Sequence, residues 1–234
     1  MLAVTFNFDS LSSEQTARFD ALTKLLQTHN QTHNLTRIID DLEIRQRHYC
    51  DSLIAVDIIK RLHAESHCSI IDIGSGAGFP ALPLAVALPN AFVTSVEATG
   101  KKVTFQQTAS AELDLKNFTP INARAEELAA EKKYRGKFDF AVSRAVADLA
   151  VLCELSLPFV RPGGFFLAWK GKKAAEELTN AQTAIKALGA QLAEVVPYTL
   201  TDAADDFKII VIKKTAPTPF KYPRQYNAIK RSPL

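Results

Sequence analysis

The order of apolar and polar positions divides the chain into a helical region, an alternating α/β region and a polar tail. Over residues 10–30, apolar side chains recur at three- and four-residue spacing, which predicts an amphipathic helix. Ser12 and Gln15 have the spacing of a capping box that would begin this helix. A second periodic stretch covers residues 42–62. Together they predict a small helical region, which is either a cap or the first layer of the main domain.

From residue 68 onward, short apolar runs alternate with helix-like stretches. The runs predict strands at residues 69–73, 91–96, 118–122, 138–143 and 164–169. Helices are predicted between them at residues 80–88, 101–113 and 149–159. This alternation predicts an α/β fold with a mostly parallel sheet. Two last β-rich segments, 191–198 and 207–212, are joined only by a polar loop at 201–206, so they predict an antiparallel hairpin.

The same pattern predicts three parts: an N-terminal helical region at 1–66, an α/β domain at 67–215 and a tail at 216–234. Four prolines predict that the tail is extended and not helical. After Asp206 the chain has seven Lys and Arg residues and no Asp or Glu, although its net charge is only +3. A cationic end of this kind is typical of a segment that meets a polyanion, and equally of a solubilising end.

Composition excludes several classes of protein. Hydrophobic residues make up 47% of the chain and charged residues 23%, which is typical of a globular protein with a buried core. No apolar run reaches the roughly 18 residues that would span a bilayer. Residues 1–9 lack the pattern of a secretory signal. We therefore expect a cytoplasmic protein that does not contact a membrane.

Cysteine and histidine spacing indicates neither a disulfide framework nor a metal site. The three cysteines are Cys50, Cys68 and Cys153. They form no C-x-x-C pair, which fits a reducing cytosol. Two histidine pairs have i, i+4 spacing, His29 with His33 and His63 with His67. Because neither pair has a third ligand nearby, no metal site is expected.

A glycine-rich turn, with Asp72, Gly74, Gly76 and Gly78 at every second position, directly follows a predicted strand and precedes a helix. Such a turn lets the backbone approach a ligand closely, although an ordinary tight turn is the alternative. A dinucleotide motif would need a third glycine where Phe79 stands. The carboxylate before the loop would also repel a pyrophosphate. S-adenosylmethionine, which has cationic amino and sulfonium groups, fits the turn better.

Two further positions could contact an adenosine. Glu97 ends the second predicted strand, where a carboxylate can accept hydrogen bonds from both ribose hydroxyls. The alternative is a solvated acid at a strand end. Residues 122–127 follow the third strand, and there the backbone near Ala125 or the side chain of Glu126 could contact the adenine edge. An ordinary helix N-terminus would explain this segment equally well.

A set of short motifs occurs in a fixed order along the chain. They are Asn34-Leu35-Thr36, Arg47-His48 with Asp51-Ser52, the segment from Asp72 to Pro80, Ser143-Arg144-Ala145, Trp169-Lys170-Gly171, Tyr222-Pro223-Arg224 and the terminal Pro233-Leu234. In this order they resemble the bacterial 16S rRNA guanine-N7 methyltransferase family, also called glucose-inhibited division protein B or the RsmG family. The tail departs from the family form at Asn227, where a glycine is common, and at Ile229, where a proline is common.

The resemblance implies a Rossmann-like class I methyltransferase fold. Its sheet would have seven mostly parallel strands with a C-terminal antiparallel hairpin, next to an N-terminal helical region. S-adenosylmethionine would be the methyl donor, and the substrate a guanine in the decoding-region loop of small-subunit rRNA, free or within the 30S subunit. A monomer is favoured. By motif, the cofactor contacts would include Gly74, Phe79, Ala125, Glu126 and Arg144.

The chemistry of guanine N7 requires little of the protein. This nitrogen has a lone pair and no proton, so its attack on a sulfonium methyl needs no general base, and catalysis can rest on positioning. No catalytic residue is therefore assigned. Arg144 and Lys170, which end the fourth and fifth predicted strands, are candidates to contact the cofactor, the guanine or a phosphate. Each could instead be a surface cation or part of a structural ion pair.

Several cations are candidates for RNA binding because they can pair with phosphates. The candidates are Arg47, His48, Lys170, Lys221, Arg224, Lys230 and Arg231. For His48, a structural hydrogen bond with Asp51 is the stronger expectation. Tyr222 and Tyr226 could stack on bases or pack the tail onto the domain.

Three rival functions share parts of this pattern. A methyltransferase of a small molecule or protein would use the same cofactor site without needing the cationic tail. An NAD-dependent oxidoreductase would use the glycines and Glu97. Asp72, Phe79 and the predicted antiparallel hairpin argue against it. A non-catalytic RNA-binding protein could keep the fold.

Overall fold

The computed structural model describes residues 5–65, 67–200 and 206–234, with only the backbone at position 33. Outside these ranges lie residues 1–4, at the N-terminal segment expected to lack a secretory signal, and residues 201–205 of the polar loop. Among the described helices, none combines the length and apolarity that crossing a membrane would require.

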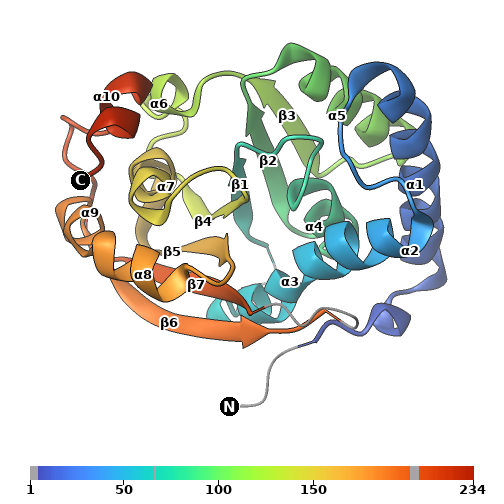
Figure 1. Ribbon diagram of the computed structural model, residues 1–234, viewed down its shortest axis with the longest axis horizontal. Coiled ribbons are helices and arrows are strands. Elements are labelled where there is room, and N and C mark those ends of the chain that lie inside the picture. The colour runs from blue at the N-terminus through green and yellow to red at the C-terminus, as the bar shows by residue number, and fades with distance from the viewer. Residues whose placement is uncertain (1–4, 66, 201–205) are drawn as a thin grey trace.

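One sheet organises the described part of the chain, with seven strands in the order β3-β2-β1-β4-β5-β7-β6 (Figure 1). The strands are β1 Ser69–Ile73, β2 Phe92–Glu97, β3 Phe118–Asn122, β4 Phe138–Arg144, β5 Val160–Lys170, β6 Ala190–Tyr198 and β7 Phe207–Lys214. The first five are parallel, and β7 pairs antiparallel with both β5 and β6. The predicted fold, a mostly parallel sheet that ends in an antiparallel hairpin, is confirmed.

The N-terminal helices follow the predicted pattern closely. Helix α1, Ser13–His33, begins with the predicted capping box, in which Ser12 and Gln15 satisfy each other's backbone N–H groups. The second periodic stretch is α2, Asp41–Ile44, a π-helical turn at Arg45–Cys50 and α3, Asp51–Leu62, in direct succession. A short 3-10 turn, η1, spans Phe8–Ser10.

The remaining helices connect the strands and cover both faces of the sheet. They are α4 Ala81–Ala87, α5 Gly100–Glu112, α6 Ala125–Leu128, α7 Leu149–Ser156, the 3-10 turn η3 Leu157–Phe159, α8 Ala174–Asn180, α9 Gln182–Ala187 and α10 Tyr226–Arg231. In Figure 1, α1, α4 and α5 lie on the right of the view, and α7 to α10 lie on the left, above β6 and β7. Right-handed crossovers between parallel strands place helices on both faces in this way.

Each face has its own buried cluster, because neighbouring strand residues point to opposite sides. Ile70 belongs to the cluster under α1, α3, α4 and α5, and Ile71 to the cluster under α6 to α10. Phe19 and Leu22 of α1 lie in the first of these clusters, together with residues of α4 and of the strands. The N-terminal helices thus pack directly on the sheet as a layer of the same core.

The tail differs from its prediction. Residues 215–225 contain no helix or strand, but Tyr226–Arg231 form α10, so the prediction of a wholly extended tail is wrong there. These six residues contain no proline. Ile229 is fully buried against the cluster that includes α7. Burial of this side chain, worth about 2 kcal/mol, stabilises a helix too short to persist alone.

Candidate active site

The glycine loop follows β1 at the carboxyl edge of the sheet. Its turn requires left-handed backbone at Gly76, with φ of +59°, and at Gly78, with φ of +95°. A Cβ at Gly76 would meet no atom within 4 Å, so this residue faces open space. A Cβ at Gly78 would lie 2.6 Å from a methyl of Leu82, so this glycine allows α4 to pack closely. The two glycines therefore serve different purposes, since one faces open space and the other allows close packing toward the core.

Glu97, at the end of β2, is tied to the loop by its carboxylate. One oxygen accepts a hydrogen bond from the N–H of Gly76 at 3.0 Å, and the other accepts one from the N–H of Thr99 at 2.8 Å. A carboxylate has about four acceptor positions, so these two bonds orient it and leave acceptors for a ligand. The position is the one predicted for a ribose contact.

Gln106 of α5 fixes the loop from behind, and the sequence pattern did not single it out. Its side-chain N–H groups donate to the hydroxyl of Ser75 at 2.9 Å and to the carbonyl of Gly76 at 2.8 Å. Its carbonyl oxygen accepts a hydrogen bond from Ser95. The sequence feature that could have identified Gln106 is its place on the inward face of the predicted helix. A buried amide at such a place needs specific hydrogen-bond partners.

Asp72 lies beneath the loop, fully buried. One carboxylate oxygen accepts a hydrogen bond from the N–H of Ala81 at 3.2 Å, at the start of α4, and the other has no hydrogen-bond partner among the described residues. Burial raises the pKa of Asp72 to about 7. The side chain does not line the cavity described next. Asp72 therefore supports the glycine loop and the start of α4, and it does not face the cavity.

A first cavity, of about 410 Å³, opens beside the loop where β1, β2 and β4 end. Its volume is in the range of small-molecule sites. Of the nine predicted cofactor residues, seven line it: Gly74, Gly76, Phe79, Glu97, Ala125, Glu126 and Arg144. The other two, Asp72 and Gly78, do not line it. Residues more than 60 positions apart in the chain are thus brought to one cavity, at the edge where open α/β sheets bind ligands.

Arg144 ends β4 and lies between several partners. Its guanidinium donates to a carboxylate oxygen of Asp51 at 2.6 Å and to the carbonyl of Arg47 at 2.8 Å. The guanidinium carbon also lies 5.6 Å from the ring centre of Phe79, a distance typical of cation–π contacts. This charged group is thereby fixed at the wall of the first cavity.

His48 completes this wall. Its ring stacks on Phe79, with ring centres 4.6 Å apart, and Nε2 lies 2.9 Å from the hydroxyl of Thr36. Burial, with the adjacent Arg144 charge as the second cause, lowers the pKa of His48 to about 3. The imidazole is therefore neutral near pH 7. The expected structural hydrogen bond of His48 is present, but its partner is Thr36 and not Asp51, whose carboxylate accepts from Arg144 and Tyr198.

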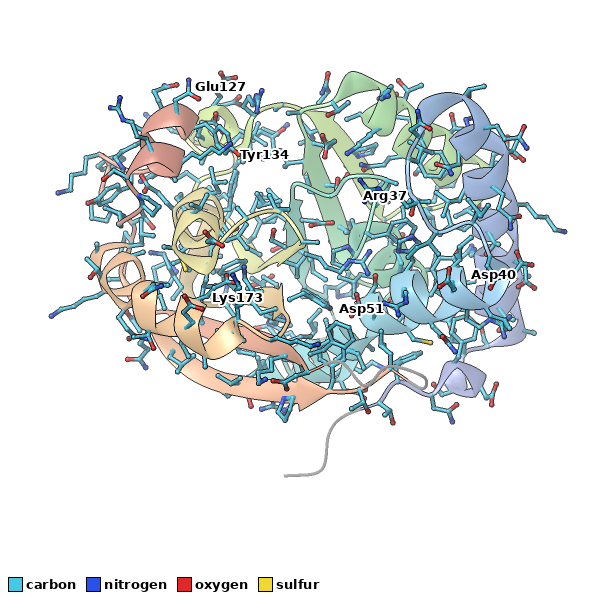
Figure 2. The ribbon with its side chains drawn as sticks, viewed as in Figure 1. Arg37, Asp40, Asp51, Glu127, Tyr134 and Lys173 are labelled. Atoms are coloured by element: carbon cyan, nitrogen blue, oxygen red, sulfur yellow. The ribbon has the colours of Figure 1, made fainter. Side chains whose placement is uncertain are left out.

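Asp51, at the start of α3, connects elements from across the chain. Besides the bond from Arg144, it accepts a hydrogen bond from the hydroxyl of Tyr198 at 2.5 Å, and its carbonyl accepts one from the indole N–H of Trp169 at 2.9 Å. Figure 2 shows Asp51 near the centre of the view, where α3 approaches the β5–β7 side of the sheet. Burial raises the pKa of Tyr198, and the neighbouring Asp51 charge acts in the same direction.

A second cavity, of about 510 Å³, adjoins the first. Both are lined by His48, Arg144 and Ala145. The second is otherwise mainly apolar and aromatic, with Ile38, Trp169, Tyr198, Leu200 and Phe207 in its lining. The arrangement therefore consists of a polar, glycine-walled cavity and an aromatic-walled one that share a boundary.

The boundary contains one strained residue. Ala145, directly after β4, has a φ of +57°, which costs a non-glycine residue roughly 1–2 kcal/mol. The next residue, Val146, lies so close to Gly74 that a Cβ there would be 2.7 Å from its side chain. The loop after β4 is therefore pressed against the glycine loop, and this contact brings the two cavities together.

Apart from His48, which is neutral near pH 7, the predicted RNA-binding cations separate into two groups. Arg47, Lys221, Lys230 and Arg231 are exposed. Lys170 is buried, with its ammonium 2.6 Å from Glu177, and lines the second cavity. Arg224 donates from three nitrogens to the buried carboxylate of Glu154. For Lys170, the structural ion pair that was the alternative to RNA contact is present. Arg224 also forms an ion pair, which the sequence pattern did not predict.

The described residues contain no group of three His, Cys, Asp or Glu side chains placed to bind a metal ion. In one of the two histidine pairs, the Nε2 of His63 lies 3.0 Å from the backbone carbonyl of His67. The other pair includes His33, whose side chain lies outside the described part of the chain.

Solved structures with the same architecture define the class of the protein. The 16S rRNA (adenine(1408)-N(1))-methyltransferase of Catenulisporales acidiphilia, solved with its cosubstrate SAM, superposes with a TM-score of 0.54 at 16% identity, over 70% of this chain and 92% of that one. TrmN from Thermus thermophilus gives a TM-score of 0.53 at 17% identity, over 70% of this chain and 48% of that one. The fold is that of the class I SAM-dependent methyltransferases.

Sequence comparison narrows this class to one family. Residues 15–202 match the family described as rRNA small subunit methyltransferase G. The protein of that name from Clostridium beijerinckii is 41% identical over 96% of this chain and 92% of its own length. The one from Leuconostoc citreum is 39% identical over 96% of this chain and 93% of its own. The chain belongs to the rRNA small subunit methyltransferase G family, as the ordered motifs predicted.

Proposed function

We propose that this protein transfers the methyl group of S-adenosylmethionine to N7 of a guanine in small-subunit (16S) ribosomal RNA. The observation that supports this best is the pair of adjoining cavities at the carboxyl edge of the sheet, which share His48, Arg144 and Ala145 as a boundary. Methyl transfer needs a donor and an acceptor side by side, and two cavities in contact provide for both.

The first cavity fits the cofactor. Gly76 offers space without a side chain, and the oriented carboxylate of Glu97 has acceptors left for ribose hydroxyls. Ala125 and Glu126 line the side where the adenine edge was predicted, and Arg144 lines the wall that is shared with the second cavity. These residues, with Gly74 and Phe79, would bind S-adenosylmethionine, which supplies an electrophilic methyl group when bound.

The second cavity suits a flat base. Trp169, Tyr198 and Phe207 provide aromatic surface, and a base taken out of its stack binds well between such side chains. Asp51 lines this cavity next to Arg144 of the boundary. Because Asp51 accepts from Arg144 and Tyr198, it keeps both side chains in place before a substrate arrives.

Proton transfer is not required of these residues. Guanine N7 attacks through a lone pair that has no proton, and His48, neutral at the boundary, adds no positive charge that would oppose the charge developing on the purine. The protein's contribution is therefore orientation and exclusion of water, which can supply a large part of a rate enhancement. Arg144 positions the boundary, with its own charge balanced by Asp51.

The substrate would be the 30S subunit or its rRNA, bound by a monomer of this chain. The exposed cations Arg47, Lys221, Lys230 and Arg231 support phosphate contacts, and Arg47 also lines the second cavity. In this proposal residues 1–66 and 67–215 form most of the two cavities, and residues 216–234 contribute cations and one lining residue of the first cavity, Tyr226.

The test is methyl transfer from radiolabelled S-adenosylmethionine to small subunits from a strain that lacks this gene. Already methylated wild-type subunits and a pool of small molecules and proteins serve as controls. We expect label in 7-methylguanosine of the deficient subunits only. Label in the small-molecule or protein pool, with none in RNA, would overturn the rRNA substrate and leave the cofactor site intact.

A further inference from the structure

We propose that the C-terminal tail is part of the cofactor site, with Tyr226 as the side chain that closes the adenine side of the first cavity. The inference rests on the proposed function in one respect, since it takes the first cavity as the site of S-adenosylmethionine. It assigns to the tail a binding role that is separate from contact with RNA.

The position of Tyr226 is the first observation. Tyr226 begins α10 and lines the first cavity together with Ala125, Glu126 and Leu155. Its ring lies 5.8 Å from the guanidinium carbon of Arg124, the residue before α6. The tail therefore reaches the segment after β3 that was predicted to contact adenine. An aromatic ring at that place offers a flat apolar surface to a flat apolar ligand.

A buried ion pair determines where this ring lies. The backbone N–H of Arg224 donates to Glu154 at 2.8 Å, and its guanidinium donates at 2.9 Å and 2.6 Å. Glu154 is 0% exposed and stands on α7, directly before the cavity residue Leu155. A pair of this geometry costs several kcal/mol to break once one partner is buried. The chain is thus attached to α7 two residues before Tyr226.

Burial on both sides of Tyr226 adds to this attachment. Tyr222 precedes the ion pair and is 9% exposed, and Ile229, one turn after Tyr226, is fully buried. Both side chains pack in the cluster that includes α7. In Figure 2, Glu127 of α6 lies at the upper left next to α10, where the tail meets the segment after β3. The tail therefore forms a wall at this end of the cavity.

The chain offers a matched control on the same tail. Phe220 is 95% exposed and contacts the guanidinium of Arg135, with 5.4 Å from the guanidinium carbon to its ring centre. It does not line the first cavity. Replacement of this aromatic residue therefore removes a tail ring without touching the proposed site.

The experiment is calorimetric titration of the full chain with two probes, S-adenosylhomocysteine and methylthioadenosine, the second of which lacks the amino-acid end. Tyr226→Ala should weaken both probes by the same factor, about tenfold, since stacking on an aromatic side chain contributes about 1–3 kcal/mol per base. Tyr226→Phe should bind both within about twofold of wild type, and Phe220→Ala should bind as wild type does. A thermal melt of each variant checks its fold, and Tyr226→Leu, which keeps apolar bulk but no ring, should also bind several-fold more weakly.

The outcomes separate the two proposals. If wild type binds both probes and Tyr226→Ala and Tyr226→Leu bind them equally well, the tail is not part of the cofactor site. A Tyr226→Ala variant that only raises KM for the 30S subunit would overturn the inference in the same way and assign the ring to RNA. Wild-type protein that binds neither probe would overturn the proposed cofactor site itself.

Discussion

The two cavities at the carboxyl edge of the sheet are built in different ways. The first is formed mainly by the glycine loop, with open space at Gly76, and by residues at or just after the ends of β1, β2, β3 and β4, to which His48 and Tyr226 add side chains. The second is formed by side chains from α3, β4, β5, β6 and β7, joined through Asp51, Arg144 and Tyr198. A cofactor that does not vary can be recognised by a short local motif. Positioning a base requires side chains that only the complete fold brings together.

The comparison predicts that the cavities can be damaged separately, except at their shared boundary. Residues that line one cavity should affect one ligand, and residues that line both should affect turnover most. The following expectations are ordered by the size of the effect.

The largest effect is expected for Arg144, which lines both cavities. Arg144→Ala would leave the carboxylate of Asp51 with only Tyr198 as side-chain partner and remove the group between donor and acceptor. We expect methylation of small subunits to fall by about 100-fold or more, because small losses of alignment have effects of this size. Single-turnover methylation measures it, with a thermal melt as the fold control. Near-normal turnover would remove Arg144 from the site.

A second expectation concerns Asp51, which touches only the second cavity. Asp51→Asn keeps its shape but loses the charge that pairs with Arg144, so the methylation rate should fall by about 30-fold, the value of one hydrogen bond to a charged group. The affinity for S-adenosylhomocysteine should change by less than about threefold, because Asp51 does not line the first cavity. Tyr198→Phe, which removes the other partner, should show the same separation with a smaller loss.

Equal losses of rate and of cofactor affinity in Asp51→Asn would contradict the division into two cavities. Such a result would mean that the boundary is shared more widely than His48, Arg144 and Ala145.

A third expectation, for Glu97, is the converse. Glu97→Gln keeps one acceptor oxygen but loses the charge and one of the bonds to Gly76 and Thr99. The affinity for S-adenosylhomocysteine should fall by about tenfold, since charge-assisted hydrogen bonds are about twice as strong as neutral ones. KM for the small subunit should stay unchanged. A raised KM for the small subunit with intact cofactor binding would mean that Glu97 acts in substrate binding and not in cofactor binding.

The last expectation concerns the pH dependence of stability, which is measured apart from turnover and binding, and involves His48. Its pKa is lowered from 6.5 to about 3, so the unfolded chain binds a proton between these values and the folded chain does not. Stability from this group is therefore complete above about pH 6.5 and is lost as the pH falls toward 3. In His48→Gln the free energy of unfolding should depend less on pH in this window. Chemical denaturation at several pH values measures it, and identical slopes in both proteins would contradict the assignment.

Much of the fold could be predicted because its signals are local. Strand β1 and strand β3 begin and end where the apolar runs do, and the capping box of α1 is readable from Ser12 and Gln15. The short helices α8 and α9 were not predicted, and the tail was predicted to be extended where α10 forms. Helices of six or seven residues depend on burial against neighbours, as Ile229 illustrates, and the sequence does not state where that burial occurs.

By itself, the sequence determined the glycine loop, the carboxylate at the end of β2 and the family, because each depends on residue type at fixed short spacing. Only the tertiary structure decided the partners. Arg224 pairs with Glu154 at a separation of 70 residues, and Lys170 with Glu177, although both cations also matched an RNA-binding pattern. An Arg or Lys side chain has the same chemistry whether it pairs with a phosphate or with a buried carboxylate. The choice is made by packing, which places a particular acid within reach and removes water from both.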